Sequence, residues 1–415
     1  MAKPAGAACN YACAYCYYLE KRALVPRAPR LRLDGPMLER FVRDNIAAQE
    51  GPEVHFTWQG GEPTLLGRPY FERVLDLQAR HCPPGKRVLN ALQTHGGLLD
   101  RDWASFLARN RFLVGLSLDG PRGLHDRGRR DRKGRSTFAA GLRALELLRD
   151  HGVDFNTLTV VHSGTAHRGA EIYRFLRRRG VRHMQFVPVV ERLDGRGALA
   201  GPPEPADHGD HAASRLLSPW TVPADGFGRF LCAVFEAWKK ADVGKVFVQV
   251  FDVLLGLHMG HPSALCTFAR TCGRTPVLEH NGDLYACDHY VYPDHRLGNI
   301  ADTPLAALAD GPRQRAFGEA KRSQLPPDCI ECRFLDLCGG GCPKHRFAPA
   351  RDGTPTLNYL CPSYRMLFAH AEADLRRMAD LLRVGLPAAL SMEKPPAPRG
   401  ERAPRRVGPR DRWRR

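Results

Sequence analysis

The sequence of 415 residues has no uninterrupted apolar run of the roughly 18 residues that a membrane-spanning helix needs. Its longest candidate, residues 246–259, is interrupted by Gln249, Asp252 and His258. No signal-peptide pattern precedes the first cysteine, Cys9, and no internal repeat is visible. We therefore expect a soluble, cytoplasmic protein of two or three domains, at about 150 residues for each domain.

Acidic residues are scarce relative to basic ones, at 44 Asp and Glu against 62 Lys and Arg, and the net charge is +18. Nine basic and only two acidic residues lie between Lys394 and Arg415. Such a balance keeps nucleic-acid binding open as a function. The simpler interpretation of residues 385–415, which are rich in Pro and Arg, is a disordered tail.

Cysteine, in contrast, is abundant, with 13 residues. Disulfides are rare in the reducing cytoplasm, so closely spaced cysteines there indicate metal binding. Eleven of the 13 fall into such groups, while Cys82 and Cys232 stand alone and are expected to be buried apolar thiols.

Strand-like and helix-like segments alternate through the first half of the chain. The predicted strands are Val54–Trp58, Val88–Gln93, Phe112–Leu118, Phe155–Val161 and Met184–Val190, with one more leading into Cys9. The predicted helices are Leu38–Ala48, Tyr70–Arg80, Asp102–Leu107, Phe138–Arg149 and Ala170–Arg179. This alternation predicts a parallel sheet in a partial (β/α)6 barrel, an α/β fold, with functional groups at the C-terminal strand ends.

The composition divides the chain further. We expect the barrel at residues 1–224, a connecting helical segment at 225–265, a cysteine-rich domain with little regular structure at 266–365 and a C-terminal helix at 366–384. The cysteine-rich stretch is dominated by Gly and Pro turns, so its core would need metal to hold it together.

The first motif is Cys9-x3-Cys13-x2-Cys16. A structural zinc site needs four ligands, so three cysteines would require a distant histidine. A four-iron, four-sulfur cluster held by only three cysteines instead leaves one iron open for a cofactor. This spacing resembles the radical S-adenosylmethionine (SAM) superfamily.

The second motif is Thr57–Thr64, with sequence TWQGGEPT, at the end of a predicted strand. Its glycines, Gly60 and Gly61, allow close approach to the backbone, and the adjacent Glu62 offers a partner for an ammonium group. Alone the string is only a turn, but its place after the cysteine motif resembles the segment that receives the SAM amino group. Ser117 and Arg129, near a later strand end, are candidates for polar contacts to SAM.

The third motif lies in the C-terminal half. It comprises Cys266, Cys272, Cys287, Cys329, Cys332, Cys338, Cys342 and Cys361. Eight cysteines can hold two fully ligated four-iron clusters, and the spacing resembles the SPASM extension of radical SAM enzymes. A pair of zinc ribbons in a nucleic-acid-binding protein is the alternative, which metal analysis would separate.

Taken together, the strings resemble the anaerobic sulfatase-maturating enzymes, over most of the chain from Lys3 to about Cys361. They include CAYCYYLEK, TWQGGEPTLL, GLSLDGPRGLHD, MQFVPVVER and YACDHYV. The resemblance implies that Cys9, Cys13 and Cys16 hold the SAM cluster. It implies contacts to SAM from Tyr15, Gly61, Ser117, Arg129 and Val190, with Gln59, Gly60 and Glu62 nearby.

The resemblance also assigns the auxiliary ligands. One four-iron cluster would be held by Cys266, Cys272, Cys287 and Cys342, and another by Cys329, Cys332, Cys338 and Cys361. These make three clusters in all, with SAM as the other cofactor. Asp288 corresponds to the catalytic base of the family.

The implied activity is oxidation of a Cys or Ser side chain in a sulfatase polypeptide, within a C/S-x-P-x-R segment, to Cα-formylglycine. The implied partners are that sulfatase and an electron donor such as flavodoxin or ferredoxin. We expect a monomeric enzyme that binds neither a membrane nor nucleic acid. A SPASM maturase that forms thioether crosslinks in another peptide is the alternative within enzymes.

Five positions depart from the family pattern. QTHGG stands where QTNGT is usual, which changes His95 and Gly97, His162 replaces an Asn, and Gly128 and Arg130 replace bulkier apolar residues. Only eight residues precede Cys9, so the first strand is expected to be shortened.

Overall fold

A computed structural model describes residues 1–18, 21, 24–25, 32–203, 216–273 and 275–392. Its largest sheet has ten strands in the order β10-β9-β8-β1-β2-β3-β4-β5-β6-β7. The barrel strands are β1 (Ala2–Lys3), β2 (Glu53–Trp58), β3 (Arg87–Thr94), β4 (Leu113–Ser117), β5 (Phe155–Val161), β6 (His183–Pro188) and β7 (Phe247–Val248). Every neighbouring pair from β1 to β7 is parallel.

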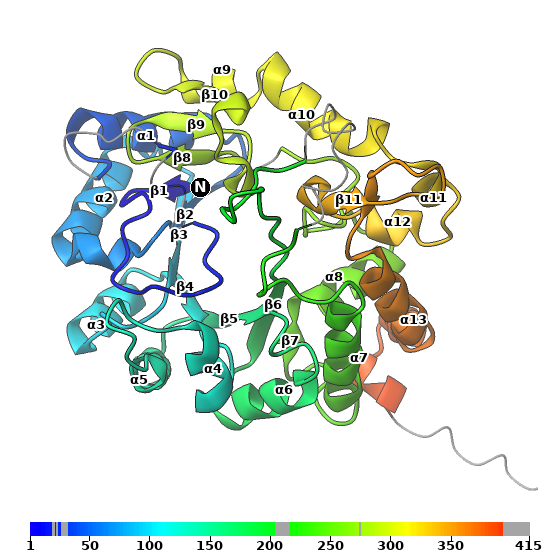
Figure 1. Ribbon diagram of the computed structural model, residues 1–415. Helices are drawn as coiled ribbons and strands as arrows, with labels where there is room; N and C mark the ends of the chain where they lie inside the picture. The colour runs from blue at the N-terminus through cyan, green and yellow to red at the C-terminus, as the bar shows by residue number, and fades with distance from the viewer. Residues whose placement is uncertain (19–20, 22–23, 26–31, 204–215, 274, 393–415) are drawn as a thin grey trace, which may run out of the picture.

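Helices cover the outer face of this curved sheet (Figure 1). They are α1 (Gly35–Ala47), α2 (Arg68–His81), α3 (Arg101–Arg109), α4 (Arg122–Gly128), α5 (Phe138–Asp150) and α6 (Gly169–Arg178). The described strands form no closed barrel, since β10 and β7 are the two ends of the sheet order. The predicted partial barrel is therefore confirmed. Helix α4 was missed, because its segment has the composition of a polar loop.

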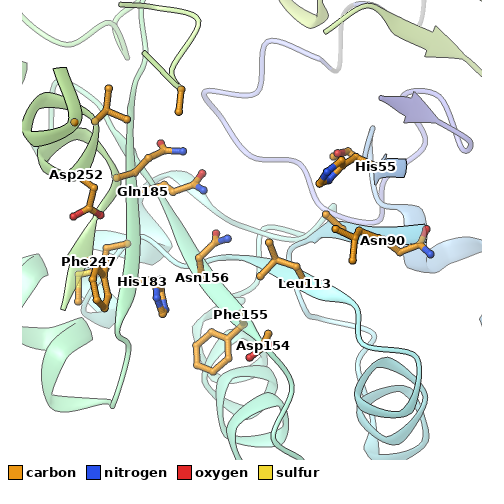
Figure 2. Close-up of a pocket in the computed structure, with 18 of the residues that line it drawn as sticks. His55, Asn90, Leu113, Asp154, Phe155, Asn156, His183, Gln185, Phe247 and Asp252 are labelled. Carbon is orange, nitrogen blue, oxygen red and sulfur yellow. The ribbon is translucent and has the colours of Figure 1, made fainter. Parts of the chain in front are cut away.

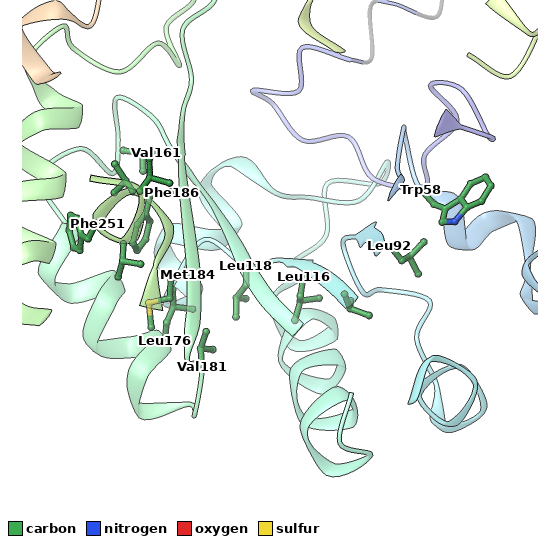
Figure 3. Packing of buried hydrophobic residues seen from close by; sticks show 14 of the residues in the cluster. Trp58, Leu92, Leu116, Leu118, Val161, Leu176, Val181, Met184, Phe186 and Phe251 are labelled. Atoms are coloured by element: carbon green, nitrogen blue, oxygen red, sulfur yellow. The ribbon is translucent and has the colours of Figure 1, made fainter. Parts of the chain in front are cut away.

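The alternation of side chains along each strand separates the core from the barrel interior. In β2, Val54, Phe56 and Trp58 are buried against the helices, and Phe41 of α1 contacts Phe56 edge-on at 5.7 Å between ring centroids. Figure 3 shows the same layer continuing from Trp58 through the inner strands to Phe251. The remaining β2 residues, among them His55, face the barrel interior.

A cavity of about 860 Å³ opens at the N-terminal ends of the strands (Figure 2). Its wall includes His55, Asn90, Asp154, His183 and Asp252. None of the predicted site residues lines it. The predicted residues instead gather at the opposite, C-terminal strand ends, where parallel α/β barrels carry their active sites.

The cysteine-rich region extends the barrel sheet. Its strands are β8 (Val277–Glu279), β9 (Asp283–Tyr285) and β10 (Arg296–Asn299), and β8 pairs in parallel with β1. Its helices are α9 (Leu305–Ala309), α10 (Pro312–Ser323), α11 (Pro327–Ile330) and α12 (Leu335–Cys338), and a small sheet pairs β11 (Arg346–Ala348) with β12 (Leu357–Asn358). Regular structure is thus more extensive here than predicted.

Three long helices lie beside this region: α7 (Gly226–Lys239), α8 (Gln249–His258) and α13 (Cys361–Arg383). Helix α13 begins five residues before the predicted boundary at 366. Ala388–Met392, within the predicted tail, form a short 3-10 helix whose Ala388 and Met392 pack on the core. The rest of the tail, residues 393–415, lies outside the described residues. Among the described helices, none has the length and apolarity to cross a membrane.

Candidate active site

The loop that carries the first three cysteines, residues 9–16, follows β1 and is held against the end of β2. The N–H of Gly61 donates to the carbonyl of Gly6 at 2.7 Å, and that of Glu62 donates to the carbonyl of Ala8 at 2.8 Å. A Cβ atom on Gly61 would lie 2.0 Å from the Ala8 oxygen, so only glycine permits this approach. Gly60 and Gly61 therefore allow the cysteine loop to pack against the end of β2, and they also line the site.

The thiols of this loop lie close enough to influence one another. Burial, together with the nearby Glu62 carboxylate and the thiols of Cys13 and Cys16, raises the pKa of Cys9 to about 12. Burial likewise raises the pKa of Cys13 to about 11, although the Arg129 guanidinium acts in the opposite direction. Buried thiols of this kind become thiolates only beside a compensating positive charge, such as iron.

A cavity of about 210 Å³ opens next to these thiols, at the C-terminal ends of the strands. All three cysteines line it. Of the eight predicted cofactor-binding residues, six line it: Tyr15, Gly60, Gly61, Ser117, Arg129 and Val190. The other two, Gln59 and Glu62, are not part of its wall.

Glu62 lies behind the cavity wall. Its carboxylate is fully buried and accepts hydrogen bonds from the Thr64 hydroxyl at 2.6 Å, the Thr94 hydroxyl at 2.7 Å and the His95 N–H at 2.9 Å. Glu62 thus ties the end of β2 to the end of β3. Its contact with an ammonium group stays a prediction.

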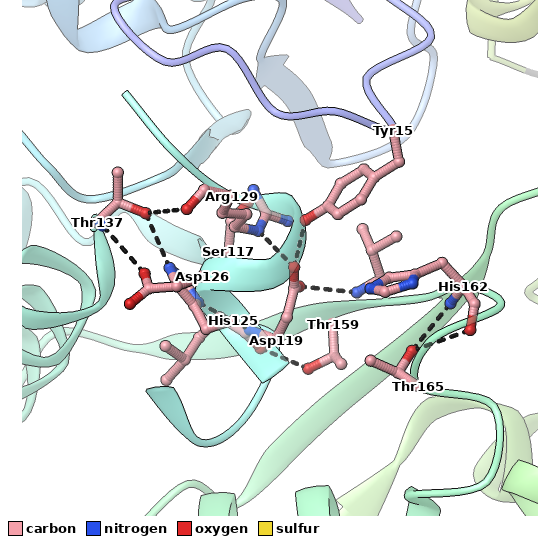
Figure 4. A network of polar contacts seen from close by, with 12 residues as sticks. Tyr15, Ser117, Asp119, His125, Asp126, Arg129, Thr137, Thr159, His162 and Thr165 are labelled. Atoms are coloured by element: carbon pink, nitrogen blue, oxygen red, sulfur yellow. Dashed lines mark hydrogen bonds and ion pairs between the residues drawn. The ribbon is translucent and has the colours of Figure 1, made fainter. Parts of the chain in front are cut away.

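Arg129 is held by a carboxylate that sequence reasoning did not select. Asp119 accepts a hydrogen bond from Arg129 Nε at 2.8 Å, a short one from the Tyr15 hydroxyl and one from the Val160 N–H at 3.0 Å (Figure 4). Burial alone would raise the pKa of Asp119, but Arg129 and the hydrogen bonds outweigh it and lower the pKa. Asp119 therefore fixes two predicted cofactor contacts at once. Its position at a strand end, in SLDGP, was the available signal.

Four of the departures from the family pattern lie against two tyrosines of the cysteine loop. His95 stacks on Tyr11 with ring centroids 3.7 Å apart, and a Cβ on Gly97 would lie 2.2 Å from the Tyr11 hydroxyl. Similarly, a Cβ on Gly128 would lie 2.3 Å from the Tyr15 ring, which stacks on His162 at 5.6 Å. Gly97 and Gly128 therefore leave the space that Tyr11 and Tyr15 need in order to stack on His95 and His162.

This matching predicts coupling between His95 and Gly97. Gly97→Thr should push Tyr11 off His95 and destabilise the protein by about 1–3 kcal/mol, the usual cost of overpacking. Adding His95→Asn removes the stacked ring and should recover part of that loss. Unfolding of the reconstituted single and double variants measures the coupling through a double-mutant cycle. Strictly additive effects would contradict it.

The far wall of the same cavity comes from the C-terminal half of the chain. It contains His289, Lys344 and His345, which face Tyr17 and Glu191 from the first half. Lys344 and Glu191 form a buried ion pair at 2.5 Å, and Tyr17 stacks on His289 with centroids 5.4 Å apart. Residues from both halves of the chain therefore line this cavity.

Asp288 lies immediately behind this wall. Its carboxylate accepts a hydrogen bond from the Tyr17 hydroxyl at 2.7 Å and forms a close ion pair with Lys3. Burial would raise the pKa of Asp288, but Lys3 and the hydrogen bonds outweigh burial and lower it well below its usual value. The carboxylate is therefore ionised at neutral pH. This contact exists because β8 pairs with β1, which brings residue 288 beside Lys3.

The eight clustered cysteines from Cys266 to Cys361 form two groups. Burial raises the pKa of Cys287, and the thiols of Cys342 and Cys266 raise it further. The same two thiols act on Cys272, whose pKa burial raises to about 11. These are the four cysteines that the resemblance assigns to one auxiliary cluster, and their thiols lie near one another.

In the second auxiliary group, burial raises the pKa of Cys329 to about 11, with further contributions from Cys361 and Cys332. Burial, with contributions from the thiols of Cys361 and Cys329, raises the pKa of Cys338 to about 12. All four thiols line one cavity of about 520 Å³. These are the four cysteines that the resemblance assigns to the other auxiliary cluster. In the part of the chain that the structure describes, no group of three or more Cys, His, Asp or Glu converges on a single metal ion.

Two family models match the chain. The radical SAM superfamily matches residues 4–176, and an iron–sulfur cluster-binding domain, SPASM, matches residues 270–333. Partial barrel, cysteine loop and SPASM region together define a radical SAM enzyme, whose domains imply iron–sulfur clusters and SAM. The predicted enzyme class is therefore confirmed.

More specific relatives are known. The chain is 40% identical to a serine-type anaerobic sulfatase-maturating enzyme of Bacteroides thetaiotaomicron, over 89% of this chain and 88% of the relative. It is 33% identical to a cysteine-type enzyme of Clostridium perfringens, over 91% and 97%. A solved structure of native anSMEcpe with bound AdoMet and Kp18Cys peptide aligns with TM-score 0.78 and 31% identity, over 91% of this chain and 98% of that one. The chain belongs to the family of anaerobic sulfatase-maturating enzymes.

Proposed function

We propose that this enzyme oxidises the Cβ atom of a Cys or Ser side chain in a sulfatase polypeptide to the aldehyde of Cα-formylglycine. The observation that carries the proposal is the 210 Å³ cavity, which is lined at one end by the three N-terminal cysteines and closed at the other by the wall next to Asp288. Relatives of both the serine and the cysteine type support it.

In this proposal, Cys9, Cys13 and Cys16 hold one four-iron, four-sulfur cluster, and the two auxiliary groups hold two more. Tyr15, Gly60, Gly61, Ser117, Arg129 and Val190 contact SAM, as their places in the cavity wall support. When bound, SAM and the N-terminal cluster would supply the radical chemistry that removes a hydrogen atom from the substrate Cβ atom, and an auxiliary cluster would take up one electron.

The residues of the chain position the substrate and move its proton. Asp288 accepts the proton of the substrate thiol or hydroxyl, and Tyr17 and Lys3 hold its carboxylate in place. The substrate thus loses one hydrogen atom, one proton and one electron. A Ser side chain then already carries the aldehyde, whereas a Cys side chain gives a thioaldehyde that water converts to the aldehyde with release of hydrogen sulfide.

The test is anaerobic incubation of the reconstituted enzyme with SAM, a reductant and two peptides that differ only in C-x-P-x-R or S-x-P-x-R. Mass spectrometry should find formylglycine in at least one peptide and 5′-deoxyadenosine in the mixture. A crosslinked peptide without aldehyde would instead indicate a thioether-forming maturase. SAM cleavage with neither product would contradict the proposal.

Flavodoxin or ferredoxin serves as the proposed electron donor to a monomeric, cytoplasmic enzyme.

A further inference from the structure

The shortest stretch of chain between the two auxiliary cysteine groups is a run of three glycines. Cys338 of the second group is followed by Gly339, Gly340 and Gly341, and then by Cys342 of the first group. The three glycines have φ values of 56°, 76° and 67°, a left-handed conformation that other residues rarely adopt. This backbone leaves room for a neighbouring side chain.

That side chain is Arg346, the first residue of β11. Its Nε donates to the carbonyl of Gly340 at 3.3 Å, and a Cβ on Gly340 would lie 2.6 Å from Nη2. The guanidinium therefore rests on the middle of the glycine run. β11 and β12 hold it there, since Arg346 pairs with Asn358, whose side-chain amide donates to the carbonyl of Cys342 at 2.9 Å.

The guanidinium lacks partners for most of its donors. Nη1 and Nη2 of Arg346 are both buried and neither makes a hydrogen bond within the described structure. Arg346 borders a cavity of about 730 Å³, but these two nitrogens are shielded from solvent, so water in that cavity does not reach them. A buried, unpaired guanidinium is strongly destabilising, so these donors require an acceptor.

Thiols of both auxiliary groups lie near it. Burial lowers the pKa of Arg346, and the groups that oppose this effect are Cys329 of the second group, Cys272 and Cys342 of the first, and the Tyr290 hydroxyl. Lys321, the other buried cation nearby, differs, because its Nζ already donates to the carbonyls of Cys266 and Thr267 at 2.7 and 2.9 Å. Of these two cations, only Arg346 therefore has N–H groups that can still donate to sulfur.

We propose that Arg346 is a positioning residue for electron transfer, which donates hydrogen bonds to sulfur at both auxiliary clusters and makes both easier to reduce. This inference rests on the proposed function. Reduction adds one negative charge to a cluster, and a fixed cation with N–H donors to its sulfurs stabilises that state. One electron from the substrate would reduce the first cluster, and its transfer to the second would reoxidise the first.

The test is an anaerobic redox titration followed by electron paramagnetic resonance. Combining Cys9→Ala, Cys13→Ala and Cys16→Ala leaves only the auxiliary clusters, about eight irons. In this background, Arg346→Met should lower the equilibrium constant for reduction of both clusters by at least about tenfold, which is 59 mV for one electron. Arg346→Lys keeps the charge without the planar fork and should recover part of the shift.

A matched control is Arg333→Met, which removes an exposed guanidinium next to Cys332. Solvent screens that charge, so neither potential should move by as much as in Arg346→Met. If Arg346→Met does not retain its iron, Arg346→Gln, which keeps an amide donor without charge, takes its place with the same expected direction.

Unchanged potentials with eight irons retained would overturn the inference, as would a shift confined to one cluster. Because the titration uses no peptide, its failure is separate from failure of the proposed function. If the wild-type enzyme oxidises peptide but Arg346→Met leaves both potentials unchanged, only the role of Arg346 is refuted. If Arg346→Met shifts both potentials but the wild-type enzyme makes no formylglycine, only the proposed substrate is refuted.

Discussion

Replacing Asp288 by Asn is expected to leave SAM cleavage intact while formylglycine falls by about two orders of magnitude, the usual loss when a general base is removed. Asn has nearly the same size and can still accept the hydrogen bond that the Tyr17 hydroxyl gives to Asp288 at 2.7 Å. It cannot accept a proton at neutral pH, and it loses the ion pair with Lys3. The variant should therefore form 5′-deoxyadenosine and stall before the aldehyde.

The measurement is the ratio of formylglycine to 5′-deoxyadenosine, with iron content determined in parallel. Asp294→Asn is the matched control, because Asp294 is an exposed carboxylate six residues further along the same region. That variant should keep the wild-type ratio. Formylglycine at the wild-type rate from Asp288→Asn, with all iron retained, would show that the carboxylate serves only to hold Lys3 and Tyr17.

The part of the fold that local patterns specify was predictable. Strands β2 to β6 and their helices follow short apolar runs and amphipathic segments, and the observed bounds of β5, Phe155–Val161, coincide with the predicted ones. Each such element is determined by residues close in sequence. The C-terminal strand ends then follow from parallel pairing, which is why Ser117, the last residue of β4, was expected at that edge of the sheet.

The pairing of β8 with β1 was not predictable in this way. Each strand is only two or three residues long, and the register joins Ala2 to Leu278 across most of the chain. Such short strands carry no periodicity. Yet this pairing places Asp288 beside Lys3, so the contact that defines the proposed base depends on structure that the local sequence does not encode.

The motifs also did not reveal which groups each side chain contacts. TWQGGEPT predicts that Glu62 meets an ammonium group, but it does not show that the same carboxylate also accepts hydrogen bonds from Thr64, Thr94 and the His95 backbone. Motif spacing specifies where a carboxylate sits along the chain, but its partners come from other strands. Asp119 was missed for the converse reason, because nothing in SLDGP shows that two residues of the site converge on it.

The largest effect is expected from the three N-terminal cysteines. Cys9→Ala, Cys13→Ala and Cys16→Ala combined should reduce iron from about twelve to about eight per chain, and SAM cleavage should cease. The eight thiols of the two auxiliary groups are untouched by these substitutions, so their iron should persist. Iron and sulfide analysis with a 5′-deoxyadenosine assay measures both effects.

Cys82 and Cys232 supply the control within the same chain. Both are free thiols, and burial raises the pKa of Cys232 to about 11, as it does for several of the grouped cysteines. A raised thiol pKa therefore does not by itself mark an iron ligand. Where the pKa of a grouped cysteine is raised, other thiols contribute to the rise, whereas the charged group that acts on Cys232 is the Glu236 carboxylate. Cys82→Ala and Cys232→Ala should thus keep about twelve irons and normal SAM cleavage. Zinc in the wild-type protein in place of iron in either auxiliary group would refute the assignment of that group.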